Sequence, residues 1–144
     1  GSIGYLDATY TDVLAPAQVA PNPFQLGVND GSRLPKAPSW KVNISPRYEV
    51  AVGEGKLVFL GDWTHTTKLR NDTEGTILLI RPSTDIVNAS VTYKAAENWE
   101  LTLGGTNLTN ERYLVTGQAQ IAGGQIYGTF SRPREWYARL GFNF

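Results

Sequence analysis

The 144-residue sequence contains no cysteine and has one histidine, His65. Disulfide frameworks and thiolate chemistry are therefore excluded, and a lone histidine cannot supply a histidine cluster for zinc. Acidic and basic residues balance at 13 each, which does not suit nucleic-acid binding through phosphate contacts. No nucleophile elbow or phosphate-binding loop is found. We predict no catalytic residue, no metal site, no cofactor, no nucleic-acid partner and no enzymatic activity.

Long apolar runs are also missing. The longest, residues 57–60 and 77–80, are far shorter than the roughly 20 residues that a transmembrane helix needs. Residues 1–4 show no signal-peptide pattern, so we expect a mature chain or a fragment. Glycine, tyrosine, tryptophan and threonine are plentiful, a composition that favours pleated sheets.

Hydrophobic residues recur with a period of two, which is typical of β-strands with one apolar face. From Trp40 to Val50 the even positions are apolar and the odd positions are polar, and residues 136–144 repeat this pattern. Similar alternation predicts further strands at residues 3–11, 57–63, 87–95 and 99–103. In the opening strand we place Gly4, Leu6, Ala8 and Tyr10 on the apolar face, because Asp7 then falls on the polar face.

The connections between these six strands alternate in length. Residues 13–39, 69–84 and 110–130 form long polar or proline-rich loops, whereas residues 53–55 and 96–98 form short turns. This alternation is typical of a transmembrane barrel with long extracellular loops and short periplasmic turns. Pro46 lies within a strand, where it removes a ladder hydrogen bond, so we predict a β-bulge there.

Aromatic residues distinguish a membrane barrel from a soluble β-sandwich. On the apolar faces they form two tiers about 26 Å apart along the strand, as expected of interfacial girdles. The loop tier holds Tyr10, Trp40, Trp63 and Trp136, and the turn tier holds Tyr48, Phe59, Tyr93, Trp99, Phe142 and Phe144. We expect lipid contact at Trp40, Ile44, Phe59, Val91, Leu101 and Leu140. We expect the lumen at Asn43, Arg47, Thr92, Thr102 and Arg139, since buried charges would need partners.

Six strands are too few for a closed barrel, which begins at about eight strands. Open strand edges in lipid would leave backbone groups without hydrogen bonds. We therefore expect residues 1–144 to be one segment of a longer barrel, or a subunit that associates with other chains.

Several motifs resemble the C-terminal barrel strands of the TonB-dependent outer-membrane receptors. The resemblance is carried by residues 4–10, by 31–40, by 85–93 followed by 99–103, by 105–113 and by the closing 132–144. It implies an all-β, antiparallel transmembrane barrel of about 22 strands in the bacterial outer membrane. It also implies a plug domain, absent from these residues, and import of a scarce nutrient, expected to be a ferric siderophore, with energy from TonB.

The resemblance also implies partners: outer-membrane lipid and lipopolysaccharide, the remainder of the barrel and its plug, TonB through that plug, and the barrel-assembly machinery. A terminal aromatic that ends an amphipathic strand resembles the signal which that machinery reads. We assign this signal to Trp136, Leu140, Phe142 and Phe144.

Arginines in or beside the long loops are the candidate ligand contacts, because guanidinium groups suit anionic ligands. They are Arg70, Arg81, Arg112, Arg132 and Arg134. Two alternatives stay open: a passive pore or small structural barrel built by association of chains, and a soluble carbohydrate-binding β-sandwich.

Overall fold

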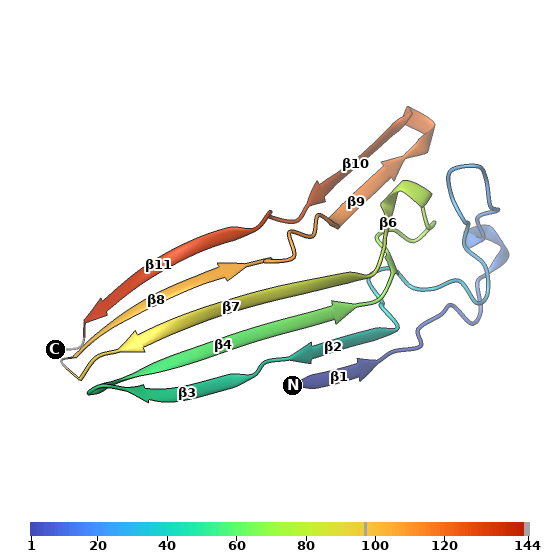
Figure 1. Cartoon of the computed structure of the whole chain (residues 1–144). Helices are drawn as coiled ribbons and strands as arrows, with labels where there is room; N and C mark the ends of the chain where they lie inside the picture. Colours follow the sequence, from blue (N-terminus) through green and yellow to red (C-terminus); the bar gives the residue numbers. More distant parts are fainter. Residues whose placement is uncertain (97, 143–144) are drawn as a thin grey trace.

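The computed structural model, which describes residues 1–96 and 98–142, has one main antiparallel sheet with the long connections gathered at one end (Figure 1). Its strands follow the order β1-β2-β4-β7-β8-β11, and β3 continues β2 along β4. Their bounds are β1 Ser2–Tyr5, β2 Trp40–Ile44, β3 Arg47–Val52, β4 Gly55–Thr66, β7 Thr84–Lys94, β8 Trp99–Thr106 and β11 Glu135–Phe142. The expected all-β, antiparallel arrangement is confirmed, and the sheet is not closed. It has seven strands among the described residues, because the one strand predicted from Trp40 to Val50 is divided into β2 and β3.

The remaining elements lie in the long connections. They are the 3-10 turns η1 Ala15–Ala17, η2 Ile77–Leu79 and η3 Ile121–Gly123, the short pair β5 Leu69–Arg70 and β6 Ile80–Arg81, and the hairpin β9 Leu114–Gln120 and β10 Gln125–Phe130. The connection after β8 is therefore largely a projecting hairpin rather than an irregular loop. No helix in the described ranges has the length and apolarity to cross a bilayer.

The short connections turn as the sequence predicts. Val52 pairs with Gly55, so only Gly53 and Glu54 separate β3 from β4. Gly53 has a φ of +59°, a backbone conformation that glycine adopts without steric cost. At the next turn Ala95 donates its amide to the carbonyl of Trp99 at 3.0 Å. Part of that turn, Glu97, lies outside the described residues.

The predicted bulge at Pro46 is wrong. Ile44 pairs with Trp63 and Arg47 pairs with Leu60, so both strands advance by the same number of residues. The amide of Gly61 still donates to the carbonyl of Pro46 at 3.0 Å. A Cβ on Gly61 would lie 3.3 Å from the proline ring. Glycine opposite proline therefore accommodates the ring, and the strand loses one hydrogen-bond donor without inserting a residue.

The predicted facing of the opening strand is also wrong. Ile3 pairs with Val42 and Tyr5 pairs with Trp40, which places Ile3 and Tyr5 on the apolar face and Gly4 opposite Lys41. The rings of Tyr5 and Trp40 are 4.7 Å apart. The strand ends at Tyr5, before the residues that we used to set its facing. Tyr5, rather than Tyr10, therefore supplies this strand's aromatic residue at the loop end.

Burial is distributed as in a membrane wall rather than a soluble domain. Among the described residues six apolar side chains are buried, and five of them lie in the connections: Val13, Val28, Leu69, Leu79 and Leu114. The sheet instead exposes large apolar side chains, including Ile44, Tyr48, Trp136, Leu140 and Phe142. A two-layer sandwich would cover such a face. The described residues form one layer, so the soluble-sandwich alternative is not supported.

We predict that one face of β8 tolerates charge and the other does not. Leu103 lies on the apolar face opposite Val91 and Ala138, while its neighbour Thr102 lies on the polar face opposite Arg139. In the full barrel, Leu103→Arg should reduce the free energy of unfolding by about 2 to 4 kcal/mol. Thr102→Arg should cost about 1 kcal/mol or less, because its charge remains hydrated.

The measurement is reversible denaturant unfolding of both variants in lipid vesicles. Equal losses in the two variants would contradict the assignment of faces.

Candidate functional site: the polar wall and the loop cluster

The polar face of the sheet is centred on Asp62 of β4. Its carboxylate accepts hydrogen bonds from Asn43 at 2.7 Å, from Ser45 at 2.9 Å and from Asn88 at 3.2 Å. These donors come from both strands that flank β4, and Thr64 adds a longer contact of 3.5 Å. A carboxylate with several donors needs no cation beside it. The wall therefore carries this charge without an ion pair.

Nearer the short turns, charges on the same face are paired within β3 and across neighbouring strands. Glu49 accepts from Arg47 and from Lys56, the latter at 3.2 Å. Lys94 of β7 lies 3.4 Å from Glu100 of β8. These pairs are partly exposed, so each contributes little to stability. These charged pairs indicate that this face of the sheet is suited to contact with water rather than with hydrocarbon.

The register places the predicted lumen residues on this polar face and the predicted lipid residues on the opposite one. Thr92 faces Thr102 with their hydroxyls 2.8 Å apart, and Arg139 pairs with Thr102 from the other side. On the apolar face, Leu101 lies between Tyr93 and Leu140. Aromatic pairs extend along that face, with Tyr48 and Phe59 6.4 Å apart and Tyr93 and Trp99 5.5 Å apart.

The three long connections pack together, and we call them the loop cluster: residues 6–39, 67–83 and 107–134. Lys36 joins all three. Its Nζ donates to the side chain of Asn71 in the second connection and, at 2.6 Å, to the carbonyl of Val115 in the third. Its amide donates to the carbonyl of Arg70 at 2.9 Å. One residue, whose backbone is in the left-handed conformation with a φ of +59°, therefore links three loops.

Two cations of the loop cluster, the exposed Lys36 and the half-buried Arg81, have lowered pKa values. Partial burial lowers the pKa of Lys36, and the nearby Arg81 lowers it further by repulsion. Burial also lowers the pKa of Arg81, whose Nε is buried without a hydrogen-bond partner among the described residues. No carboxylate of the described ranges forms an ion pair with either residue. An anion beside them would relieve both costs.

Three of the five predicted arginines gather at the base of the β9–β10 hairpin. Arg81 lies over the ring of Tyr113 at 4.0 Å, and Arg112 lies over the ring of Phe130 at 4.7 Å. Tyr113, Phe130 and Arg132 line a hollow of about 350 Å³ that opens beside the polar face of β7 and β8. Arg132 is highly exposed and lies 4.0 Å from Glu135. Cations stacked on aromatic rings beside a hollow can bind a planar or anionic ligand.

The other two arginines lie elsewhere. Arg70 directs its guanidinium to the carbonyl of Gly27 at 3.4 Å and covers Gly75, so it connects two loops. Arg134 points to the carbonyl of Leu108 at 3.4 Å, just before Trp136 on the strand that follows. The structure therefore brings Arg81, Arg112 and Arg132 together. It leaves Arg70 as a contact between two loops and Arg134 as a separate residue at the start of β11.

Two residues that hydrogen-bond separate segments of the loop cluster together, Lys36 and Asn107, were not predicted as site residues. Lys36 gave no signal, because its partners are 35 and 79 residues away in sequence. Asn107 belongs to a motif that we did identify, and it is 7% exposed with a φ of +50°. Its side chain donates to the carbonyls of Glu111 at 2.9 Å and Arg132 at 3.0 Å. It thus holds together the two chain segments at the base of the hollow.

His65 and the closing strand complete the predicted sites. His65 lies on the apolar face, with its Nδ1 2.9 Å from Asp85. The described residues contain no group of three or more potential metal-ligating side chains. Trp136, Leu140 and Phe142, three of the residues predicted to form an assembly signal, are exposed along one face of β11. Phe144, the fourth member, lies outside the described residues.

Comparisons with known proteins decide the family. The sequence model described as "TonB dependent receptor-like, beta-barrel" matches residues 1–108, three quarters of the chain. The chain belongs to this family. No match was found among curated proteins.

Two solved structures have the same fold. The ferric yersiniabactin uptake receptor FyuA from Yersinia pestis superposes with a TM-score of 0.72 at 17% identity, over 80% of this chain and 18% of that receptor. BauA, the ferric preacinetobactin receptor from Acinetobacter baumannii, gives a TM-score of 0.61 at 21% identity, over 80% of this chain and 16% of that receptor. The chain spans less than a fifth of either receptor. It is part of a receptor barrel and not an enzyme.

We predict that loss of Lys36 loosens all three loops together. Lys36→Met in the full receptor removes the donor shared by the second and third connections, at a cost of about 1 kcal/mol in local stability. Hydrogen exchange followed by mass spectrometry should show faster exchange in residues 67–83 and 107–134. Lys68→Met, which changes an exposed lysine of the same loop cluster, is the control. Faster exchange in only one connection would show that Lys36 does not couple them.

Proposed function

We propose that this chain forms the C-terminal wall segment of an outer-membrane receptor that imports a ferric siderophore, with TonB supplying energy through a plug domain outside these residues. The observation that carries the proposal is the group of arginines on aromatic rings beside the hollow, without a carboxylate partner for Arg81 or Arg112 among the described residues. Unpaired cations at the mouth of a polar wall suit an anionic ligand.

The position of this group supports import rather than adhesion. The hollow lies where the polar face meets the loop cluster, and the polar face continues from Asn88 toward Asp62 and on to the Lys94–Glu100 pair. A ligand released from the loops would therefore meet a hydrated wall along the barrel. The apolar opposite face suits the lipid of the bacterial outer membrane.

The neighbours support the ligand class. FyuA is described as a ferric yersiniabactin uptake receptor and BauA as a ferric preacinetobactin receptor, and both contain this wall arrangement. We extend the ligand class, ferric siderophores, to this chain. We further propose that the barrel-assembly machinery reads Trp136, Leu140 and Phe142 on β11, together with Phe144.

The test is a charge-selective binding experiment on the full receptor. A panel of ferric siderophores of known charge is screened first, and the tightest anionic and tightest uncharged members are kept. The double variant Arg81→Gln/Arg112→Gln should weaken binding of the anionic one by about tenfold, since charge-assisted contacts are lost. Binding of the uncharged one should change by less than about twofold.

Arg139→Gln is the matched control, because Arg139 faces the polar wall far from the hollow, opposite Thr102. It should leave both affinities unchanged. Equal weakening of both ligands by the double variant would contradict charge recognition. A panel in which no ferric siderophore binds would contradict the ligand class.

A further inference from the structure

The projecting β9–β10 hairpin has one strand edge that no described residue covers. On its inner side β9 contacts η2 and β6, and the carbonyl of Val115 accepts the hydrogen bond from Lys36. On its outer side β10 pairs with β9 alone. Adjacent residues of an antiparallel strand direct their backbone groups to opposite sides, so about half of the amides and carbonyls of β10 point away from β9. We call the outer side of residues 125–130 the hairpin edge.

The hairpin edge lacks the features that keep an exposed strand from pairing. Natural edges are blunted by proline, by lysine or other charges, or by a bulge. Residues 114–130 contain neither a proline nor a charged residue. The register shift beside Phe130 places its extra residue, Val115, on β9, so β10 runs without interruption. Ile126, Tyr127 and Thr129 favour extended strands. The hairpin edge is therefore suited to accept another strand.

The hairpin edge also continues the free edge of the main sheet. β9 follows β8 and β10 leads into β11, so the uncovered side of β10 is the same side as the uncovered side of β11. Figure 1 shows β10 and β11 following each other along one margin of the molecule. Between them, the amide of Ser131 donates to the carbonyl of Tyr113 at 2.8 Å, which keeps the two chain segments together.

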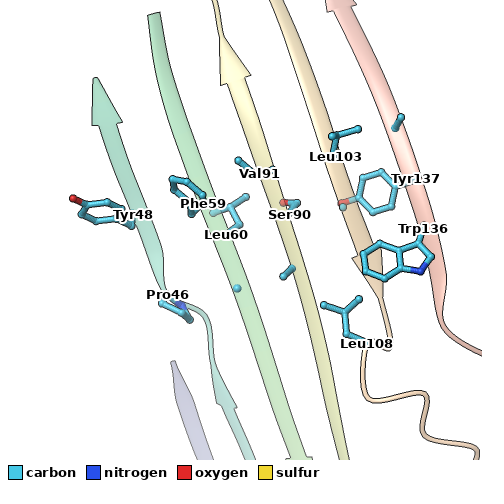
Figure 2. A pocket seen from close by; sticks show the side chains of 14 residues that line it. Pro46, Tyr48, Phe59, Leu60, Ser90, Val91, Leu103, Leu108, Trp136 and Tyr137 are labelled. Carbon is cyan, nitrogen blue, oxygen red and sulfur yellow. The ribbon is translucent and has the colours of Figure 1, made fainter. Parts of the chain in front are cut away.

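The edge of β11 is open to a further strand. Figure 2 shows the rings of Trp136 and Tyr137 leaning from β11 toward β8. A Cβ on Gly105 would lie 2.9 Å from Trp136 Cε3, and a Cβ on Gly104 would lie 2.5 Å from Tyr137 Cζ. The chain spans less than a fifth of either receptor, and a barrel wall leaves no strand edge unpaired. A strand outside residues 1–144 is therefore needed beside β11, and we call it the adjoining strand.

We propose that the adjoining strand runs on past the barrel wall and adds to the hairpin edge, so that its extension, β10 and β9 form one sheet above the barrel. Strand addition of this kind uses the free backbone groups of an exposed edge. A strand that is already aligned along β11 has only to stay extended to reach β10, so little further loop entropy is lost. The proposal goes beyond the ligand class and does not depend on it.

A strand of the same receptor fits the hairpin edge better than a second copy does. Neighbouring strands of an up-and-down barrel are antiparallel, so the adjoining strand would meet β10 in the antiparallel arrangement. Two receptors inserted in one membrane have the same orientation, and their β10 strands would meet in parallel. Parallel pairing is slightly less stable per residue, and it would not continue any pairing along β11.

The added strand would hold the hairpin beside the hollow. β10 ends at Phe130, which lines the hollow and carries Arg112 over its ring at 4.7 Å. Lys36 already holds β9 from the other side through Val115. With both sides of the hairpin hydrogen-bonded, its base keeps one position. The adjoining strand is thereby assigned a positioning role at the hollow without contacting a ligand.

The first test is photo-cross-linking in the full receptor in lipid, with isotope-labelled and unlabelled copies mixed. A benzophenone amino acid at Ala138 of β11 identifies the adjoining strand. The same group at Tyr127 should capture that strand roughly ten residues further on, because paired strands advance at the same rise per residue. Gln118, opposite Tyr127 on β9, is the control position. It should capture the extension with about fivefold lower yield, since it lies one strand spacing further away.

The second test asks whether both sides of β10 are hydrogen-bonded. Neighbouring amides point to opposite sides, so one of the variants Ile126→Pro and Tyr127→Pro removes a donor to β9 and the other removes a donor at the hairpin edge. With the edge paired, each variant should speed hydrogen exchange of residues 114–130 by about tenfold. The hairpin lies outside the barrel wall, so the wall still forms in both variants.

Two results would overturn the proposal. One is capture from Tyr127 of a second copy, of another segment or of nothing, while Ala138 still identifies the adjoining strand. The other is a proline variant whose exchange equals that of the parent, because that amide would then face solvent. Neither test uses ferric siderophore binding as its readout. A receptor that binds no siderophore but gives both expected results would remove the ligand class and leave the strand addition in place.

Discussion

The structure depends on backbone hydrogen bonding between neighbouring strands. In hydrocarbon no water can satisfy a free amide or carbonyl, so a strand wall must pair its own backbone groups. The central strands do this in an unbroken register, from Lys56 opposite Lys94 to Thr66 opposite Thr84. Even at Pro46, where a donor is missing, the Gly61 amide keeps its bond. Once the register is set, the face of every side chain is set with it.

The fixed register has opposite consequences on the two faces. On one, carboxylates are satisfied by cations, as Glu49 is by Lys56, or by neutral donors, as Asp62 is by Asn43. On the other, large apolar side chains remain exposed, as a wall that faces lipid would require. The buried apolar side chains that a soluble domain would have in its core lie instead mainly in the loop cluster, where Leu79 is 2% exposed. The proposed ligand region lies where the polar wall and this packed cluster meet.

Period-two patterning predicted the strands that carry it over many residues. The stretch from Val87 to Lys94 alternates cleanly, and its facing is as predicted. The opening strand is only four residues long, so its alternation was too short to set a facing, and the pairing of Tyr5 with Trp40 decided it. The bulge at Pro46 was predicted from the proline alone. The proline ring is accommodated by Gly61 on the neighbouring strand. The pattern of a single strand carries no information about that neighbour.

The site was less predictable than the wall. Residue type alone suggested the arginines as candidate ligand contacts, but their partners depend on how the loops fold. Arg81 stacks on Tyr113, whereas Arg70 donates a hydrogen bond to the carbonyl of Gly27. Lys36 has no periodic neighbours, and its contacts lie 35 and 79 residues away. Long-range contacts between irregular segments leave no repeating signal in a sequence. The alternating pattern specifies the sheet, while individual side-chain contacts specify the loop cluster.

The most direct measurement of the central claim is a scan of single cysteine substitutions along β7, which the absence of native cysteine in these residues permits. Spin labels at residues 87–94 in the full receptor, reconstituted in lipid, are tested with oxygen and with a water-soluble relaxing agent. The account predicts a period of two, with oxygen access highest at Val87, Ala89, Val91 and Tyr93 and aqueous access highest at Asn88, Ser90, Thr92 and Lys94. Uniform accessibility along the strand, or the opposite phase, would contradict it.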